Sequence, residues 1–260
     1  MEILVCIKQV PDTTEIRIDP ETNTLIRTGV PSIMNPFDAY AVEQALQLKE
    51  MTDGRVTVVT MGPPQAKSIL GDALAMGVDD AYLVTDRKFG GSDTLATSYI
   101  LASVARKLGP FDVILCGKQA IDGDTGQVGP EMAEHLDIPQ ITYVSSVEVD
   151  GKGVKAVREC TKHQEIVTAQ LPVVITVKGE QEPRFETIRG RLHANRYEIK
   201  SLTRDELPVE DESIGLKGSA TRVKRSFTPE RHAECVWIKG ESVREQAGKL
   251  YEALERANVI

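Results

Sequence analysis

The sequence predicts an α/β fold with a doubly wound, mostly parallel sheet. Strand and helix patterns alternate four times over about 130 residues, an order that implies parallel strands joined by right-handed crossovers. The strand segment 113–116 is apolar throughout, as a strand covered on both faces should be. Each strand ends in a polar or glycine-bearing loop. These loops gather at one edge of the sheet and favour a nucleotide-binding, Rossmann-like arrangement.

The first elements are a strand over residues 2–8, a surface hairpin formed by 17–19 and 24–27, and a helix. We expect Asn35 to cap this helix with its side chain, since a proline follows at the first turn. Apolar residues at helical spacing extend the helix to about residue 51.

Two further strand–helix pairs follow. A buried strand over 56–61 leads to a helix over 69–76, which a glycine terminates. A third strand over 81–84 leads through the loop 90–94 to a helix over 95–108.

The fourth strand and the segment after it, residues 111–130, organise the chain. A glycine-rich loop follows the strand, and the next helix, over 131–136, directs its amino end at this loop. Free backbone N–H groups and the positive end of the helix dipole make that end an anion site, with phosphate or pyrophosphate as the natural occupant. We expect Gly123, Gly126 and Gly129 to let the backbone approach such a ligand.

Other interpretations of this loop stay open. Glycine-rich loops are common in α/β proteins, and this one is neither the G-x-G-x-x-G nor the Walker A pattern. Asp122 and Asp124 would repel a phosphate unless they act as helix caps or bind ribose and base. They also allow a magnesium site, although a hard cation usually needs more oxygen ligands nearby.

After residue 139 the pattern changes to β structure. Strand patterns cover 141–149, 153–158, 164–169 and 173–177, with a tight turn between the first two. They predict antiparallel structure that extends the main sheet or is appended to it.

The remainder of the chain lacks the composition of a core. Residues 183–191 are basic and irregular, and 201–229 are polar with few apolar clusters. Such a stretch is expected to lie across another surface. A final helix over 242–258 carries apolar side chains on one face. An arm followed by such a helix favours a permanent partner subunit, with packing on the chain's own domain as the alternative.

Composition argues against several classes of protein. A net charge of -8 and 5% aromatic residues disfavour nucleic-acid binding. No apolar run approaches the roughly twenty residues that cross a bilayer, and a strand starts at residue 2, which leaves no signal peptide. The four cysteines are scattered without a CxxC pair, which argues against a zinc or iron–sulfur site. We therefore expect no metal, no membrane span and a cytoplasmic location.

The sequence shows no catalytic constellation. None of the four histidines accompanies a Ser or Cys in a nucleophile motif, and no paired carboxylates or H-E-x-x-H pattern occurs. A nucleotide cleft without a nucleophile or general base predicts a carrier or binding subunit, or a redox protein whose cofactor performs the chemistry.

Several sequence blocks together resemble a known family. The chain is similar, over essentially its full length, to the beta subunit of electron-transfer flavoprotein. The blocks that carry this resemblance are VCIKQV at 5–10, MNPFD at 34–38, ALAMGVD at 73–79, GKQAID at 117–122, TGQ at 125–127 and LPVV at 171–174. Their common order makes the resemblance specific, whereas any one block alone would be weak.

The resemblance implies a nucleotide-binding α/β fold and an obligatory alpha subunit that carries FAD. In common members of the family the beta-subunit site holds a structural AMP. In the electron-bifurcating branch it holds a second FAD that takes hydride from NADH. The family's nucleotide site maps onto Cys6, Asn35, Met61, Asp122, Gly123, Asp124, Thr125, Gly126, Gln127 and Val128.

Two features resemble the bifurcating branch. Gly123 and Asp124 form a short bridge where AMP-type members have a longer loop, which leaves room for a flavin. The block 90–98 also resembles bifurcating members, and the hydroxyls of Thr94 and Thr97 are suited to bond a flavin ring or ribityl chain. The alternative for this block is simple N-capping of a helix.

The family's docking loop for acyl-CoA dehydrogenases maps onto 183–191, with Ile188 at the apolar anchor position. Arg184, Arg189 and Arg191 surround this apolar tip and suit a transient acidic partner. The lysine-rich run that usually follows is replaced here, so the identity of the dehydrogenase stays open.

The resulting hypothesis is the small subunit of an electron-bifurcating electron-transfer flavoprotein. FAD on this subunit would accept hydride from NADH. One electron would pass to ferredoxin or flavodoxin, and the other through the alpha-subunit FAD to an acyl-CoA or related dehydrogenase. One rival is a non-bifurcating carrier with structural AMP. Another is a nucleotide sensor of the universal-stress type, which would not need the C-terminal arm.

The domain organisation expected from the sequence has two parts. Residues 1–200 form the α/β nucleotide-binding domain, with a β extension at about 141–180 and the partner-docking loop at about 183–197. Residues 201–260 form a C-terminal arm and a helix that pack on the partner subunit.

Overall fold

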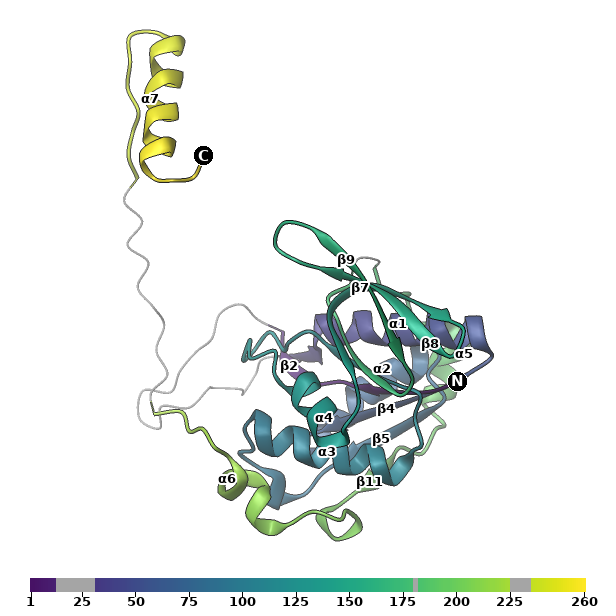
Figure 1. Ribbon diagram of the computed structural model, residues 1–260. Helices are drawn as coiled ribbons and strands as arrows, with labels where there is room; N and C mark the ends of the chain where they lie inside the picture. The colour runs from purple at the N-terminus through teal and green to yellow at the C-terminus, as the bar shows by residue number, and fades with distance from the viewer. Residues whose placement is uncertain (13–30, 180–181, 225–234) are drawn as a thin grey trace. The chain divides into compact units, whose positions relative to one another are not determined.

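The computed structural model describes residues 1–12, 31–179, 182–224 and 235–260 (Figure 1). The surface hairpin predicted within 17–27 lies outside these residues. The chain divides into two compact units, Met1–Lys224 and Arg225–Ile260.

The first unit is built on a nine-stranded sheet with the order β11-β5-β4-β1-β6-β10-β7-β8-β9. The seven strands from β11 to β7 run parallel, and β8 and β9 continue the sheet as antiparallel strands. The strands are β1 (Glu2–Cys6), β4 (Arg55–Met61), β5 (Asp80–Val84), β6 (Val113–Gly117), β7 (Gln140–Asp150), β8 (Gly153–Glu159), β9 (Gln164–Gln170), β10 (Val173–Val177) and β11 (Lys200–Leu202). A separate antiparallel pair joins β2 (Gln9–Pro11) to β3 (Ser32–Met34).

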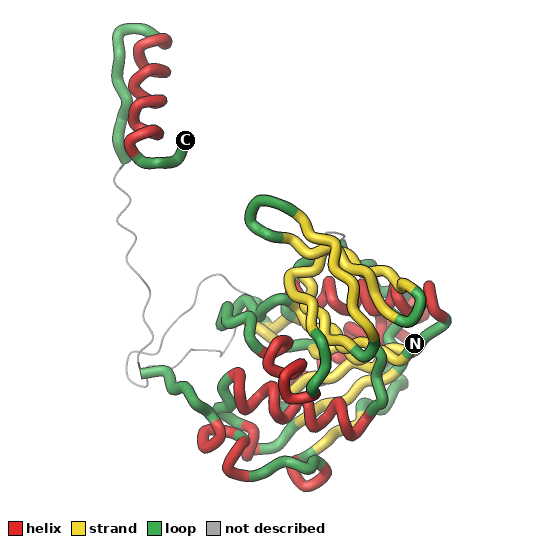
Figure 2. Tube along the Cα trace, in the orientation of Figure 1, coloured by secondary structure: helices red, strands yellow, loops and turns green. Residues whose placement is uncertain are grey.

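Helices cover both faces of the sheet, which confirms the predicted doubly wound arrangement (Figure 2). One core cluster joins the sheet to α1 (Pro36–Thr52), α2 (Lys67–Met76) and α5 (Ile188–Ala194). The other joins it to α3 (Thr94–Leu108) and α4 (Val128–Leu136). Successive β1 side chains enter opposite clusters, which is why residues 3–6 are apolar without interruption.

Short helical turns complete the first unit. They are η1 (Pro64–Ala66), η2 (Arg87–Phe89), η3 (Arg204–Glu206), η4 (Asp211–Ser213) and the short helix α6 (Gly215–Gly218).

One strand of the predicted antiparallel region is placed differently. β7, β8 and β9 are antiparallel neighbours, as expected. The antiparallel prediction was wrong for β10, which pairs in parallel with both β6 and β7. All five residues of β10 are buried. This continuous burial is typical of a central strand covered on both faces, whereas a strand with one exposed face alternates buried and exposed residues.

The segment after residue 182 is also more regular than its composition indicated. Thr187 caps α5 by accepting a hydrogen bond from the Gly190 N–H (2.9 Å), so part of the predicted irregular stretch is a helix.

Residues 201–224 pack on the chain's own first unit. β11 extends the main sheet beside β5, and β11 and the segment after it bury apolar side chains in the cluster that contains α3. These side chains are Leu202, Leu207, Val209 and Ile214. The compact unit therefore extends to Lys224, beyond the boundary expected at residue 200.

The second unit contains α7 (Val243–Arg256). Ser242 caps it by accepting a hydrogen bond from the Glu245 N–H (3.3 Å). Val243 and Tyr251 are exposed on this helix. Across the described ranges, no helix has both the length and the apolar character needed to cross a membrane.

Truncation distinguishes a domain boundary at Lys224 from the boundary expected at residue 200. We predict that a chain ending at Lys224 keeps a cooperative thermal transition, since its core is complete. A chain ending at Lys200 loses four buried apolar side chains, each worth about 1.5–3 kcal/mol, and should melt at a much lower temperature or fail to fold. Circular dichroism melts measure this. Equal melting temperatures for the two truncations would contradict the packing described here.

Candidate functional site

The candidate site lies where the direction of the strand order reverses. From β1 the chain moves outward through β4 and β5, and then returns to place β6 on the other side of β1. Ligands of open α/β sheets bind outside the carboxyl ends of the strands at such a switch point. The loop 118–127, which connects β6 to α4, leaves the sheet at this position.

Asn35 holds this loop in place. Its fully buried side chain donates from Nδ2 to the Gln119 carbonyl (2.8 Å) and accepts at Oδ1 from the Ile121 N–H (3.1 Å). The expected side-chain cap on α1 was wrong, because Asn35 makes no such bond. A carboxamide offers one acceptor and two donor hydrogens, and here it satisfies backbone groups of the loop instead.

Asp38, in the first turn of α1, joins the ends of the two central strands. Its carboxylate accepts hydrogen bonds from the N–H groups of Lys8 (2.7 Å) and Gly117 (3.1 Å). A Cβ atom on Gly117 would lie 2.3 Å from Asp38 Oδ1, so glycine is required there. Burial raises the pKa of Asp38 to about 7, although these hydrogen bonds act in the opposite direction.

The role of Asp38 could not be predicted from the sequence. An acidic residue in the first turn of a helix is the ordinary partner of the helix dipole and by itself carries no signal of a site. Only the contact with two strand ends reveals its function.

The two aspartates of the loop are both engaged. Asp122 forms an ion pair with Lys8 (2.6 Å), and Asp124 accepts a hydrogen bond from Gln119 Nε2 (2.8 Å). Asp124 and Gly126 both have left-handed backbone conformations (φ 49° and 63°), which turn the loop toward α4. The repulsion expected between Asp122 and an anion is therefore reduced by a neighbouring cation.

The magnesium alternative receives no support from the described residues. Among these residues, one group of three side chains has potential metal-ligand atoms within 4.8 Å of one another, namely Cys160, His163 and Glu165. Neither loop aspartate belongs to this group.

The glycines of the loop differ in role. A Cβ on Gly123 would enter open space, as a ligand-facing position allows. On Gly129 it would lie 2.5 Å from Thr176 Cγ2, so this glycine lets α4 pack closely on β10. The prediction that Gly129 makes room for a ligand was wrong, because a protein side chain already occupies that space.

The start of α3 contacts the loop. Thr94 Oγ1 lies 3.1 Å from Gln127 Oε1 and 3.2 Å from Glu131 Oε1. Glu131 Oε2 is buried and has no hydrogen-bond partner among the described residues. Asp93 caps α3, which confirms the N-capping given as the alternative for the block 90–98, although Thr94 and the half-buried Thr97 are not the capping residues.

Other predicted site residues lie around this centre. Met61 is half-buried at the end of β4, Thr125 is exposed in the loop, and Val128 begins α4. Cys6 is different, because its thiol lies 3.9 Å from Met132 Sδ inside the core. Contact with Cys116 and burial raise the pKa of the Cys6 thiol, so this side chain is a neutral core group.

The predicted docking residues divide into two kinds. The Arg184 guanidinium donates to Glu43 on α1 (2.8 Å) and to Glu50, and its contacts hold the pKa of Glu43 below the usual range despite burial. Arg191 pairs with Asp72 on α2 (2.9 Å). These arginines therefore fix the segment to the domain.

Apolar side chains on the same segment face outward. Ile188 is 84% exposed, and Phe185 and Leu192 are exposed with it. Arg189 is also exposed on α5.

A doubly wound sheet with a polar, glycine-bearing loop at its switch point is typical of the class of nucleotide-binding proteins. Comparison with known proteins specifies this further. The pattern of the electron transfer flavoprotein domain matches residues 22–207.

Curated relatives match over nearly the whole chain. The electron transfer flavoprotein beta subunit of Megasphaera elsdenii is 52% identical, over 95% of this chain and 94% of that protein. That of Clostridium acetobutylicum is 53% identical over 88% of this chain and 89% of its own length. Subunit CarD of the caffeyl-CoA reductase-Etf complex of Acetobacterium woodii is 45% identical over the full length of both. The chain therefore belongs to the electron transfer flavoprotein family, as a beta subunit.

We predict that Asp38→Asn removes a pH-dependent contribution to stability. The pKa of Asp38 is raised from 3.8 to about 7, so between these values the folded chain binds more protons at Asp38 than the unfolded chain. Its contribution is complete below pH ~4 and is lost as the pH rises through ~7. The excess stability of the wild type over the variant should therefore fall across this interval. Urea denaturation at each pH measures it.

At pH ~4 the variant should be about 1–3 kcal/mol less stable, because an amide N–H replaces an acceptor for one backbone donor, and this difference should shrink as the pH rises. The exposed Asp205→Asn serves as the control and should leave the pH profile unchanged. A pH-independent difference for Asp38→Asn would contradict the assignment.

Proposed function

We propose that this beta subunit is of the electron-bifurcating type and binds FAD at the loop 118–127. NADH is the electron donor. A low-potential acceptor of the ferredoxin or flavodoxin kind receives one electron, and an acyl-CoA or related dehydrogenase receives the other through the FAD of an alpha subunit.

The contact between Thr94 and Gln127 carries this proposal. The sequence features that resemble the bifurcating branch lie in two segments, 90–98 and 122–128, which are separate along the chain. The hydrogen bond between Thr94 and Gln127 (3.1 Å) joins these segments at one place. A single ligand can therefore contact both, as a flavin dinucleotide would and a smaller mononucleotide need not.

The residues present fit a dinucleotide. Loop backbone N–H groups and the amino end of α4, a nine-residue helix, suit its phosphates. Lys8 supplies positive charge next to Asp122. The buried Glu131 Oε2, which has no partner among the described residues, is an acceptor suited to a ribose or ribityl hydroxyl.

When bound, the flavin supplies the capacity to take two electrons from a nicotinamide and release them singly. This chain's own residues bind and orient. Asn35 and Asp38 fix the loop to the sheet, and Lys8 offsets the loop's acidic charge. The hydroxyls of Thr94 and Thr97 provide hydrogen-bonding groups on α3.

A structural AMP is the alternative occupant. Its phosphate would use the same loop and the same end of α4, so the groups that suit an anion do not separate the two ligands. We expect the segment 90–98 to separate them, because a flavin dinucleotide is long enough to reach α3 from the loop whereas AMP need not contact it.

The proposed partners follow from the family and from the exposed surfaces. An alpha subunit would form the heterodimer, with α7 of the C-terminal unit as one contact. The exposed Ile188, Phe185 and Leu192 provide an apolar surface for the dehydrogenase, held in place by Arg184 and Arg191. We place the complex in the cytoplasm.

Counting the bound cofactors tests the proposal. The complex co-expressed with its alpha subunit should contain two FAD per heterodimer, and NADH should bleach the flavin absorbance rapidly. One FAD and one AMP per heterodimer would contradict FAD binding by this chain and would identify a non-bifurcating carrier.

A variant localises the second flavin. Thr94→Val removes the hydroxyl that joins α3 to Gln127 and should lower beta-site FAD occupancy, while leaving the alpha-subunit FAD in place. Thr168→Val, at an exposed position of β9, is the matched control and should keep two FAD. Equal occupancy in the two variants would remove Thr94 from the site.

A further inference from the structure

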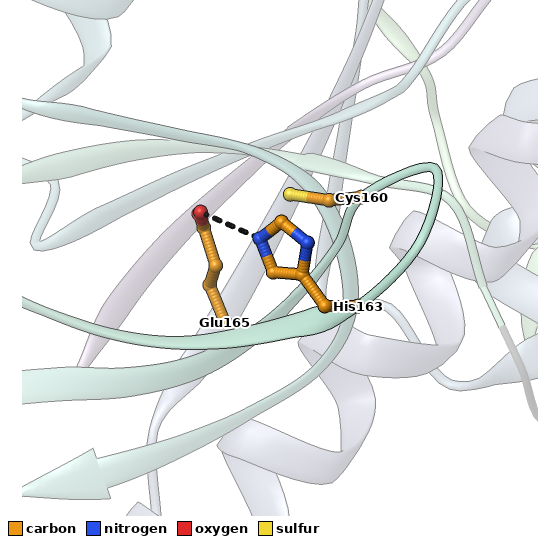
Figure 3. A group of neighbouring side chains, drawn as sticks. All are labelled: Cys160, His163 and Glu165. Atoms are coloured by element: carbon orange, nitrogen blue, oxygen red, sulfur yellow. Dashed lines mark hydrogen bonds and ion pairs between the residues drawn. The ribbon is translucent and has the colours of Figure 1, made fainter.

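The β8–β9 hairpin carries a group of side chains that the nucleotide site does not use. They are Cys160, His163 and Glu165 (Figure 3). A sulfur, an imidazole nitrogen and a carboxylate oxygen from these residues all lie within 4.8 Å of one another.

The hairpin itself brings these side chains together. Glu159 pairs with Gln164, and the Cys160 N–H donates to the His163 carbonyl (2.9 Å), so Cys160 and His163 face each other across the turn. Glu165 lies two residues beyond His163 and therefore on the same face of the strand. A three-residue ligand set on one face thus follows from the register of two strands.

The spacing of the ligand atoms suits a small tetrahedral ion. His163 Nε2 lies 3.2 Å from Glu165 Oε1. Ligands bonded at about 2.0–2.1 Å in a tetrahedron stand about 3.3 Å apart. These two atoms are therefore already at the separation that coordination requires, and the nearby sulfur needs only a small side-chain movement.

The neighbouring charges orient the carboxylate. Glu165 Oε2 forms an ion pair with Arg158 Nη1 (3.4 Å), which leaves Oε1 directed toward His163. An outer contact of this kind is what commonly fixes a metal-ligating carboxylate.

We propose that Cys160, His163 and Glu165 bind one divalent ion of the zinc class, with water as the fourth ligand. Thiolate and imidazole are ligands that zinc prefers, whereas magnesium and calcium require several oxygens. The His163 and Glu165 side chains are 63% and 41% exposed, so an ion and a water can reach them. The bound ion connects the end of β8 to the start of β9 across the turn.

The absence of a CxxC pair had argued against zinc in this chain. Here one cysteine is sufficient, because the hairpin supplies the other two ligands at the spacing Cys-x-x-His-x-Glu.

Metal titration of the reduced, full-length chain tests this site, with Zn²⁺ and Co²⁺ as the probes. We expect one ion per chain and, with Co²⁺, a thiolate-to-metal charge-transfer band. Cys160→Ser should abolish the band. His163→Gln and Glu165→Gln should each weaken binding about tenfold or more, since even outer contacts of a metal site have effects of 10- to 100-fold.

Matched controls use the same residue types elsewhere. Cys235→Ser and His193→Gln alter exposed side chains outside the group and should leave stoichiometry and affinity unchanged. Absence of the charge-transfer band in the wild type would overturn the proposal. So would a band that survives in His163→Gln and Glu165→Gln, since the cysteine alone would then account for binding.

Discussion

The nucleotide site depends on the hydrogen bonds that Asp38 makes at the carboxyl ends of β1 and β6. One carboxylate accepts from the N–H of Lys8 and from that of Gly117, and so fastens the start of α1 to both central strands. Because these strands flank the switch point, the same contact fixes the position from which the loop 118–127 departs. Asn35, three residues earlier, then holds the loop through Gln119 and Ile121.

This arrangement places acidic groups in a site that should receive phosphates. Each acidic side chain has its own polar partner: Lys8 pairs with Asp122, Gln119 donates a hydrogen bond to Asp124, and Thr94 contacts Glu131. Backbone N–H groups and the end of α4 can then act on a ligand with less opposing charge. The unpartnered oxygen of Glu131 is the exception, because it is buried and has no hydrogen-bond partner among the described residues.

Much of the fold could be predicted from local patterns. The alternation of elements and the apolar strands predicted the parallel sheet, and the loop 118–127 leaves it at the switch point. β10 was misassigned because an apolar run does not reveal the direction in which a strand pairs. Residues 201–224 were expected on a partner because their few apolar residues are scattered, yet Leu207 and Ile214 reach the core through the fold.

The contacts of the candidate site were less predictable than the fold. Asn35 was identified, but its expected cap on α1 is replaced by contacts with the loop. Thr94 and Gln127 were each singled out, and only the fold shows that they touch. Tertiary hydrogen bonds of this kind leave no periodic trace in a sequence, because they join segments with independent local structure.

Hydrogen exchange on the heterodimeric complex tests the central claim, that a dinucleotide lies at the switch point between β1 and β6 and reaches α3. Amide exchange would be compared between FAD-loaded and FAD-depleted protein. FAD should slow exchange in two segments, the loop 118–128 and residues 94–98, and leave the β8–β9 hairpin unchanged. Slowing confined to the loop, or located elsewhere in the chain, would contradict the account.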